Sequence, residues 1–88
     1  MKLSTTNIDI DHPNGQANFT RVGIGNLTLW FSYKTIVAFR VAGQHPVVRR
    51  NDWGPTTGKH LNLIDGGDTA SRVHSETFDR LLSELEVI

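Results

Sequence analysis

The stretch that decides the fold is Leu27–Val41, which reads LTLWFSYKTIVAFRV. Apolar and polar side chains alternate in both halves of it, and a period of two is the pattern of a strand with one buried face. The residues that share the apolar face are Leu27, Leu29, Phe31 and Tyr33 in the first half and Val37, Phe39 and Val41 in the second. The stretch therefore predicts two antiparallel strands, 27–33 and 35–41, joined by a short turn.

The apolar faces also predict how these two strands pair. A slip of one residue would turn the whole apolar face of a strand to the other side of the sheet. We expect Phe31 to lie opposite Phe39, with the connection around residues 34–36. The same pairing sets Trp30 against Arg40 on the outer face, where the two side chains can form a cation–π contact.

Shorter strand signals lie on both sides of this hairpin. Ile8 and Ile10 alternate with polar residues, and residues 16–22 look extended. Residues 46–50 form a further candidate strand, and Pro46 belongs at its start or at a sheet edge because proline has no amide hydrogen to donate. These segments extend the hairpin into an antiparallel meander of about four to five strands.

The C-terminal pattern is that of an amphipathic helix at about residues 75–86. Ser75 is a good N-cap residue. The apolar side chains spaced to share one helix face are Phe78, Leu81, Leu82 and Leu85. Such a stripe must pack against another element, and the apolar face of the meander is the available surface.

Together these patterns predict one α+β domain over residues 1–88, a small antiparallel β-meander with one C-terminal α-helix packed on one face. Residues 1–7 are expected to be flexible. Residues 51–72 follow neither strand nor helix periodicity. We interpret them as a long ordered loop that is pinned by Trp53 and Leu61 and that contains one helical turn near residues 59–63.

Composition limits the possible functions. The chain has no cysteine, so it has no disulfide and no thiolate, which fits a cytoplasmic location. No segment approaches 18 apolar residues, so we expect no membrane span. Net charge is zero, but residues 34–60 carry +4 and residues 61–88 carry −4. A basic middle and an acidic tail either attract an anionic partner or neutralise each other across the fold.

The loop contains the stretch WGPTTGKHLN at residues 53–62. Its glycines invite comparison with a phosphate-binding P-loop, but only three residues separate Gly54 from Gly58, and His60 replaces the hydroxyl that would hold magnesium. A nucleotide P-loop is therefore disfavoured. Two readings stay open: a looser anion site at Lys59, or a structural loop whose threonine hydroxyls bond its own backbone.

The candidate binding residues fall into two groups, one on the outer sheet face and one on the loop. The outer-face group is Trp30, Arg40 and Arg49, and the loop group is Trp53, Thr57, Lys59, His60 and Asn62. Aromatic and basic side chains on a sheet suit single-stranded nucleic acid, and tryptophan and arginine are also common anchors of protein interfaces. The four histidines lack metal-ligand spacing, and we expect no metal, no cofactor and no catalytic set.

Two runs carry a resemblance to a known group of proteins. LWFSYKTIVAFR at residues 29–40 and WGPTTGKHLN at residues 53–62 resemble a family of small uncharacterised domains of bacteriophages and mobile elements, which pairs an FSYxTxVAFR strand segment with a TTGKHLN loop. The resemblance implies a small accessory protein in the host cytoplasm that binds a host protein or nucleic acid.

The sequence thus favours a non-enzymatic binding module that uses loop 53–62 and the outer sheet face, and a homodimer through the sheet is also open. The alternative is a small enzyme or a nucleotide- or anion-binding protein centred on Lys59 and His60. A concave pocket lined by the loop residues would favour the alternative. Loop residues lying flat beside Trp30 and Arg40 would favour the binding module.

Overall fold

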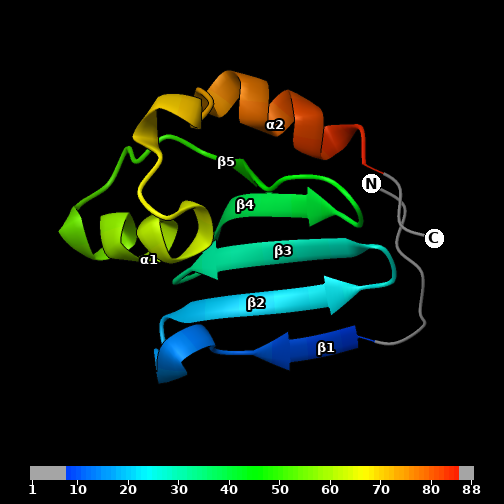
Figure 1. Cartoon of the computed structure of the whole chain (residues 1–88), viewed down its shortest axis with the longest axis horizontal. Helices are drawn as coiled ribbons and strands as arrows, with labels where there is room; N and C mark the ends of the chain where they lie inside the picture. The colour runs from blue at the N-terminus through cyan, green and yellow to red at the C-terminus, as the bar shows by residue number, and fades with distance from the viewer. Residues whose placement is uncertain (1–7, 86–88) are drawn as a thin grey trace.

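The computed structural model describes residues 8–85 and shows a five-stranded antiparallel sheet with two α-helices (Figure 1). The strands are neighbours in chain order: β1 (Ile8–Asp11), β2 (Phe19–Ile24), β3 (Leu27–Ser32), β4 (Thr35–Val41) and β5 (Val47–Val48). The helices are α1 (Pro55–Asp65) and α2 (Ser75–Ser83), and two short 3-10 turns are η1 (Pro13–Gly15) and η2 (Thr69–Ser71).

The predicted α+β meander and its C-terminal helix are confirmed. The helix begins at Ser75, whose predicted N-cap role is wrong because His74 is the N-cap residue. The predicted flexibility of residues 1–7 and the predicted helical end at residue 86 lie outside the described residues.

One face of the sheet is covered by α2, which lies beside β5 in Figure 1. Phe78 of α2 is fully buried, and its ring lies 5.4 Å from that of Phe39 on β4. Burying a side chain of this size stabilises the fold by about 1.5–3 kcal/mol. Phe78 and Phe39 belong to a hydrophobic cluster between α2 and the sheet, whose buried residues are Ile24, Leu27, Leu29, Phe39 and Phe78. The alternating residues of β3 thus point as the sequence predicts.

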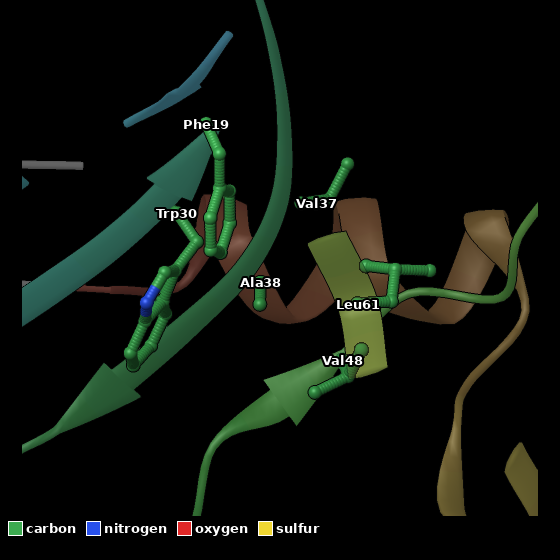
Figure 2. Packing of buried hydrophobic residues seen from close by; sticks show 6 residues of the cluster. All are labelled: Phe19, Trp30, Val37, Ala38, Val48 and Leu61. Atoms are coloured by element: carbon green, nitrogen blue, oxygen red, sulfur yellow. The ribbon is translucent and has the colours of Figure 1, made fainter. Parts of the chain in front are cut away.

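The opposite face is partly covered by α1, which sits at one end of the sheet in Figure 1. Leu61 of α1 is fully buried there. Figure 2 shows it with the other residues of this second cluster, Phe19, Trp30, Val37, Ala38 and Val48. Within residues 8–85, no element covers the remainder of the face over β1 to β4, which is lined by charged and polar residues together with Ile10, Gly23 and Trp30.

The interpretation of residues 51–72 as a long loop is wrong, because they contain the eleven-residue helix α1. Pro55 is the first helical residue, where its missing amide hydrogen costs nothing. Gly66 ends the helix at φ 69°, a conformation that favours glycine, and its N–H bonds the Asn62 carbonyl.

The predicted pairing of β3 with β4 is also wrong, by two residues. Leu29 lies opposite Phe39, and Arg40 lies opposite Thr28 instead of Trp30. The turn is only Tyr33 and Lys34, and a bulge follows at Trp30 and Phe31. A two-residue slip keeps a side chain on its face, so Leu27, Leu29, Phe31, Phe39 and Val41 do share the predicted apolar face. The prediction is wrong for Val37, which the bulge turns to the opposite face, and for Tyr33, which lies exposed in the turn.

Candidate functional site

Residues 53–62 divide between the protein surface and its core. Successive helical residues are rotated by about 100°, so Thr57 and His60 turn toward the sheet and are buried, whereas Lys59 and Asn62 are exposed. Trp53, before the helix, is 44% exposed. Neither expected arrangement occurs, and Lys59 and His60 do not share one site.

Three side chains from β3 and α1 form a buried hydrogen-bonded network. The Ser32 hydroxyl lies 2.8 Å from Nδ1 of His60 and 3.0 Å from the Thr57 hydroxyl. Ser32 is 3% exposed and His60 is 2% exposed. A buried hydroxyl or ring nitrogen without a partner costs about 1–3 kcal/mol. The network therefore joins the sheet to α1 at little energetic cost.

The imidazole ring of His60 is also fixed by aromatic neighbours. It stacks on Phe19 with centroids 4.9 Å apart and an angle of 6° between the planes, and the Tyr33 ring lies 6.1 Å away at a tilt. Burial lowers the pKa of His60 below its ordinary value, because the cation loses its hydration. The ring is therefore neutral at pH 7. In this state Nδ1 can either accept the Ser32 proton or donate its own to the Ser32 oxygen.

A pocket of about 150 Å³ lies beside this network. Its lining residues are Ser32, Tyr33, Thr35, Val37, Trp53 and Thr57. Tyr33 is 53% exposed and Trp53 is 44% exposed, so two aromatic side chains from distant segments flank the opening. All lining side chains are uncharged. The pocket can therefore accept an uncharged side chain or small group between two aromatic surfaces.

Trp53 is held by its own loop. Its amide N–H donates to the Asn51 side chain at 3.0 Å, and the Asn51 amide donates to the Gly54 carbonyl at 3.2 Å. The guanidinium of Arg49 lies 4.8 Å from the centre of the indole ring, a cation–π contact. A β-carbon on Gly58 would come within 3.1 Å of the Asn51 amide nitrogen. Glycine at position 58 thus leaves room for the loop that positions Trp53.

Arg49 does not lie on the outer sheet face as predicted. Besides Trp53, it lies 3.8 Å from Asp52 and 3.8 Å from Asp79 of α2. Its charge is therefore balanced by two carboxylates at a contact between α2 and the loop.

The outer-face group keeps only Trp30 and Arg40. Trp30 is 8% exposed, so it is largely a core residue and not the open stacking surface that the sequence suggested. Arg40 is exposed beside it, over a shallow hollow of about 560 Å³. The residues that line the hollow are Asp9, Ile10, Asp11, Arg21, Gly23, Thr28, Trp30 and Arg40.

Asn62 supports a buried ion pair. Arg72 lies 2.7 Å from the Asp65 carboxylate and also donates to Asn62 at 2.9 Å. Burial alone would raise the pKa of Asp65, but hydrogen bonds from Arg72 and from the Gly67 amide outweigh burial and hold that pKa below its usual value. Asn62 therefore stabilises the end of α1. The sequence had not marked Arg72, Ser32 or Tyr33 as site residues, because a single residue of these types carries no spacing signal.

No helix within residues 8–85 is long and apolar enough to cross a membrane. In the same range, no three His, Cys, Asp or Glu side chains are grouped as metal ligands would be.

Neither a curated protein nor a solved structure matches the chain. The sequence model of one family matches residues 4–80, which is most of the chain. The chain therefore belongs to that family, a family of unknown function (DUF8033).

Proposed function

We propose that the protein is a non-enzymatic binding module that engages another protein through the pocket between Tyr33 and Trp53. The observation that carries the proposal is the exposure of these two aromatic side chains at one uncharged pocket. Tryptophan and tyrosine are among the residues that contribute most to binding energy in protein interfaces. A pocket of about 150 Å³ suits a single uncharged side chain of the partner.

The two aromatic residues are held in place before any partner binds. Tyr33 sits in the two-residue turn at φ 56°, and its N–H bonds the Asn18 carbonyl at 2.7 Å. Trp53 is held by Asn51 and Arg49. Each side chain that is ordered only on binding costs about 0.5–1.5 kcal/mol, so prior ordering favours affinity.

Charge favours a protein partner over nucleic acid. Affinity for nucleic acid grows with the number of phosphates that Lys and Arg neutralise. Here Arg49 faces Asp52 and Asp79, and the chain has no net charge. If the chain is phage-encoded, as the resemblance implies, the partner is a protein of the host cytoplasm.

A displayed library of random peptides tests the proposal. Peptides are selected on the wild-type protein, and their affinities are then measured for Trp53→Ala, Tyr33→Ala and Leu63→Ala. Leu63 on α1 is the matched control because it is also 44% exposed but does not line the pocket. We expect at least about tenfold weaker binding for the two pocket variants and unchanged binding for Leu63→Ala. Failure to enrich any peptide, or equal binding to Trp53→Ala, would contradict the proposal.

A second candidate function, acyl transfer, is favoured by the Ser32–His60 hydrogen bond at the same pocket. The first helical hydrogen bond of α1 runs from the Gly58 N–H to the Gly54 carbonyl. The amides of Thr56 and Thr57 precede it, and such amides at a helix start can stabilise an oxyanion.

In this reaction, Ser32 would transfer its proton to Nδ1 of His60 while Oγ bonds the carbonyl carbon of an ester. The departing alcohol takes that proton from His60, and water then releases the acid by the same route. A fluorophosphonate probe should label Ser32, as read by mass spectrometry, and should not label Ser32→Ala. Absence of label on wild-type Ser32 excludes this second candidate and leaves the binding proposal intact.

A further inference from the structure

The open part of the outer sheet face carries an ordered arrangement of charge. The strand register places Asp9, Gly23, Thr28 and Arg40 in one row across β1 to β4. The small residues Gly23 and Thr28 thus separate an acid on the edge strand from a base three strands away. With strands about 4.8 Å apart, the Asp9 and Arg40 backbones lie roughly 14 Å from each other. The face is acidic at one side and basic at the other.

A second row lies parallel to the first and is partly neutralised. It consists of Asp11, Arg21, Trp30 and Ala38. Asp11 and Arg21 form an ion pair within the chain. In contrast, neither Asp9 nor Arg40 has an ion-pair partner within residues 8–85. These two charges, on opposite sides of the hollow of about 560 Å³, are available to a partner.

We infer that this face binds a second copy of the same chain. A two-fold axis parallel to the strands brings the acidic side of one copy over the basic side of the other. Each Asp9 then meets Arg40 of the other copy, so the contact forms twice. The chain has zero net charge, so two copies approach without overall repulsion. The face is complementary to itself in charge, which is the reason for choosing a second copy as its partner.

Association through the β1 edge is disfavoured by the same residues. Two antiparallel β1 strands would place Asp9 and Asp11 of one copy against the same acids of the other, and like charges directly opposite destabilise a strand pair. The sheet-face contact also leaves the pocket between Tyr33 and Trp53 free, because the two sites share no lining residue. The inference therefore stands independently of the proposed function.

The face that is left open by α1 is small, and exposed ion pairs are weakened by salt. We therefore expect a weak dimer with a Kd on the order of 10–100 µM at low salt, in the range of transient interfaces. The Kd is measured by sedimentation equilibrium of the full chain. The protein concentration runs from about 5 to 500 µM, at low salt and in about 0.5 M salt. Wild type should dimerise at low salt and dissociate at high salt.

A charge swap identifies the face. Asp9→Arg and Arg40→Asp alone should each weaken self-association by roughly tenfold or more, because two attractive contacts become repulsive. An equimolar mixture of the two variants should dimerise again, since both contacts then join an acid and a base. Arg80→Asp on α2 makes the same charge change away from this face and should dimerise like wild type.

Three results would each overturn the inference. The first is wild-type protein that remains monomeric at about 500 µM in low salt, where a transient dimer should form. The second is a mixture of Asp9→Arg and Arg40→Asp that fails to associate. The third is an equal loss of association in Arg80→Asp, which would show that net charge alone controls it.

Discussion

The Ser32 hydroxyl on β3 lies 2.8 Å from Nδ1 of His60 on α1, although the two residues are 28 positions apart in the sequence. This bond connects the end of the β3 strand to the buried side of the helix. Ser32 also lines the pocket that Tyr33 and Trp53 flank. The packing of α1 on the sheet and the shape of the pocket therefore depend on the same polar contact.

The first prediction concerns Ser32→Ala. The substitution removes the group that bonds both the Thr57 hydroxyl and His60 Nδ1. Two buried polar atoms then lack a partner, so we expect a loss of about 1–3 kcal/mol in the free energy of unfolding. Urea unfolding measures the loss. Ser83→Ala at the exposed end of α2 is the control and should change stability by less than about 0.5 kcal/mol.

The second prediction concerns pH. Burial lowers the pKa of folded His60 below its ordinary value of 6.5, so on acidification the unfolded chain takes up a proton there before the folded chain does. The stability contributed by the neutral ring is complete above about pH 6.5 and is lost as the pH falls through the folded pKa.

Urea unfolding between about pH 8 and pH 5 should show this loss in wild type. His45 is exposed, so the control variant His45→Gln should show the same loss. His60→Gln should lack the part of this acid-induced loss of stability that comes from His60. Parallel curves for wild type and His60→Gln would contradict the prediction.

The apolar face of β3 was predictable because it depends only on alternation, whereas the bulge turned Val37 of β4 away from its predicted face. Leu27, Leu29 and Phe31 all point toward α2. The pairing was not predictable, because it depends on a turn at Tyr33, which adopts φ 56° without being glycine or asparagine. A bulge then adds one residue to β4. Neither feature leaves a compositional signal.

Helix α1 was not predicted beyond one turn near residues 59–63, because its buried side is not apolar. Of the three residues it buries, Thr57 and His60 are polar, and their partners come from β3. Gly58 and the two threonines are also weak helix formers. For the candidate site, Trp53 was predicted both to pin the loop and to bind a partner. It is 44% exposed, so burial of its ring does not pin the loop, and its binding role stays a prediction. The role of Ser32 could not be predicted, since a serine at an alternate strand position is ordinarily an exposed polar residue.

The third prediction concerns Gly58→Ala. Within a helix, alanine is more favourable than glycine by about 1 kcal/mol. The new β-carbon would lie 3.1 Å from the Asn51 amide nitrogen and would displace the side chain that holds Trp53. A lost hydrogen bond costs a similar amount, about 1 kcal/mol. We therefore expect little change in thermal stability but a clear change in the fluorescence of Trp53, recorded in a Trp30→Phe background.

Asn51→Ala is the matching variant for this third prediction. It should change the fluorescence of Trp53 in the same direction as Gly58→Ala, because both variants release the Trp53 amide. If Gly58→Ala raises stability by the full helix-propensity difference and leaves the fluorescence unchanged, Asn51 does not position Trp53.

The fourth prediction concerns the buried pair of Asp65 and Arg72, whose charged atoms lie 2.7 Å apart. Arg72→Met leaves the carboxylate buried without its cation, and breaking such a pair costs about 3–5 kcal/mol at neutral pH. The double variant with Asp65→Asn should recover part of this loss, since no buried charge remains.

The hydrogen bonds from Arg72 hold the pKa of Asp65 below its ordinary value of 3.8, so wild type loses this stability only as the pH falls through that lowered pKa. In Arg72→Met, burial instead raises the pKa of Asp65 above 3.8, so the variant regains stability as the pH falls through that raised pKa. The stability gap to wild type should therefore narrow as the pH falls from about 7 toward 3. Urea unfolding measured from pH 7 to pH 3 tests this prediction, and Arg80→Met, at an exposed position, is the control. A stability gap between wild type and Arg72→Met that stays constant over this pH range would show that the ion pair is not the source of the lost stability.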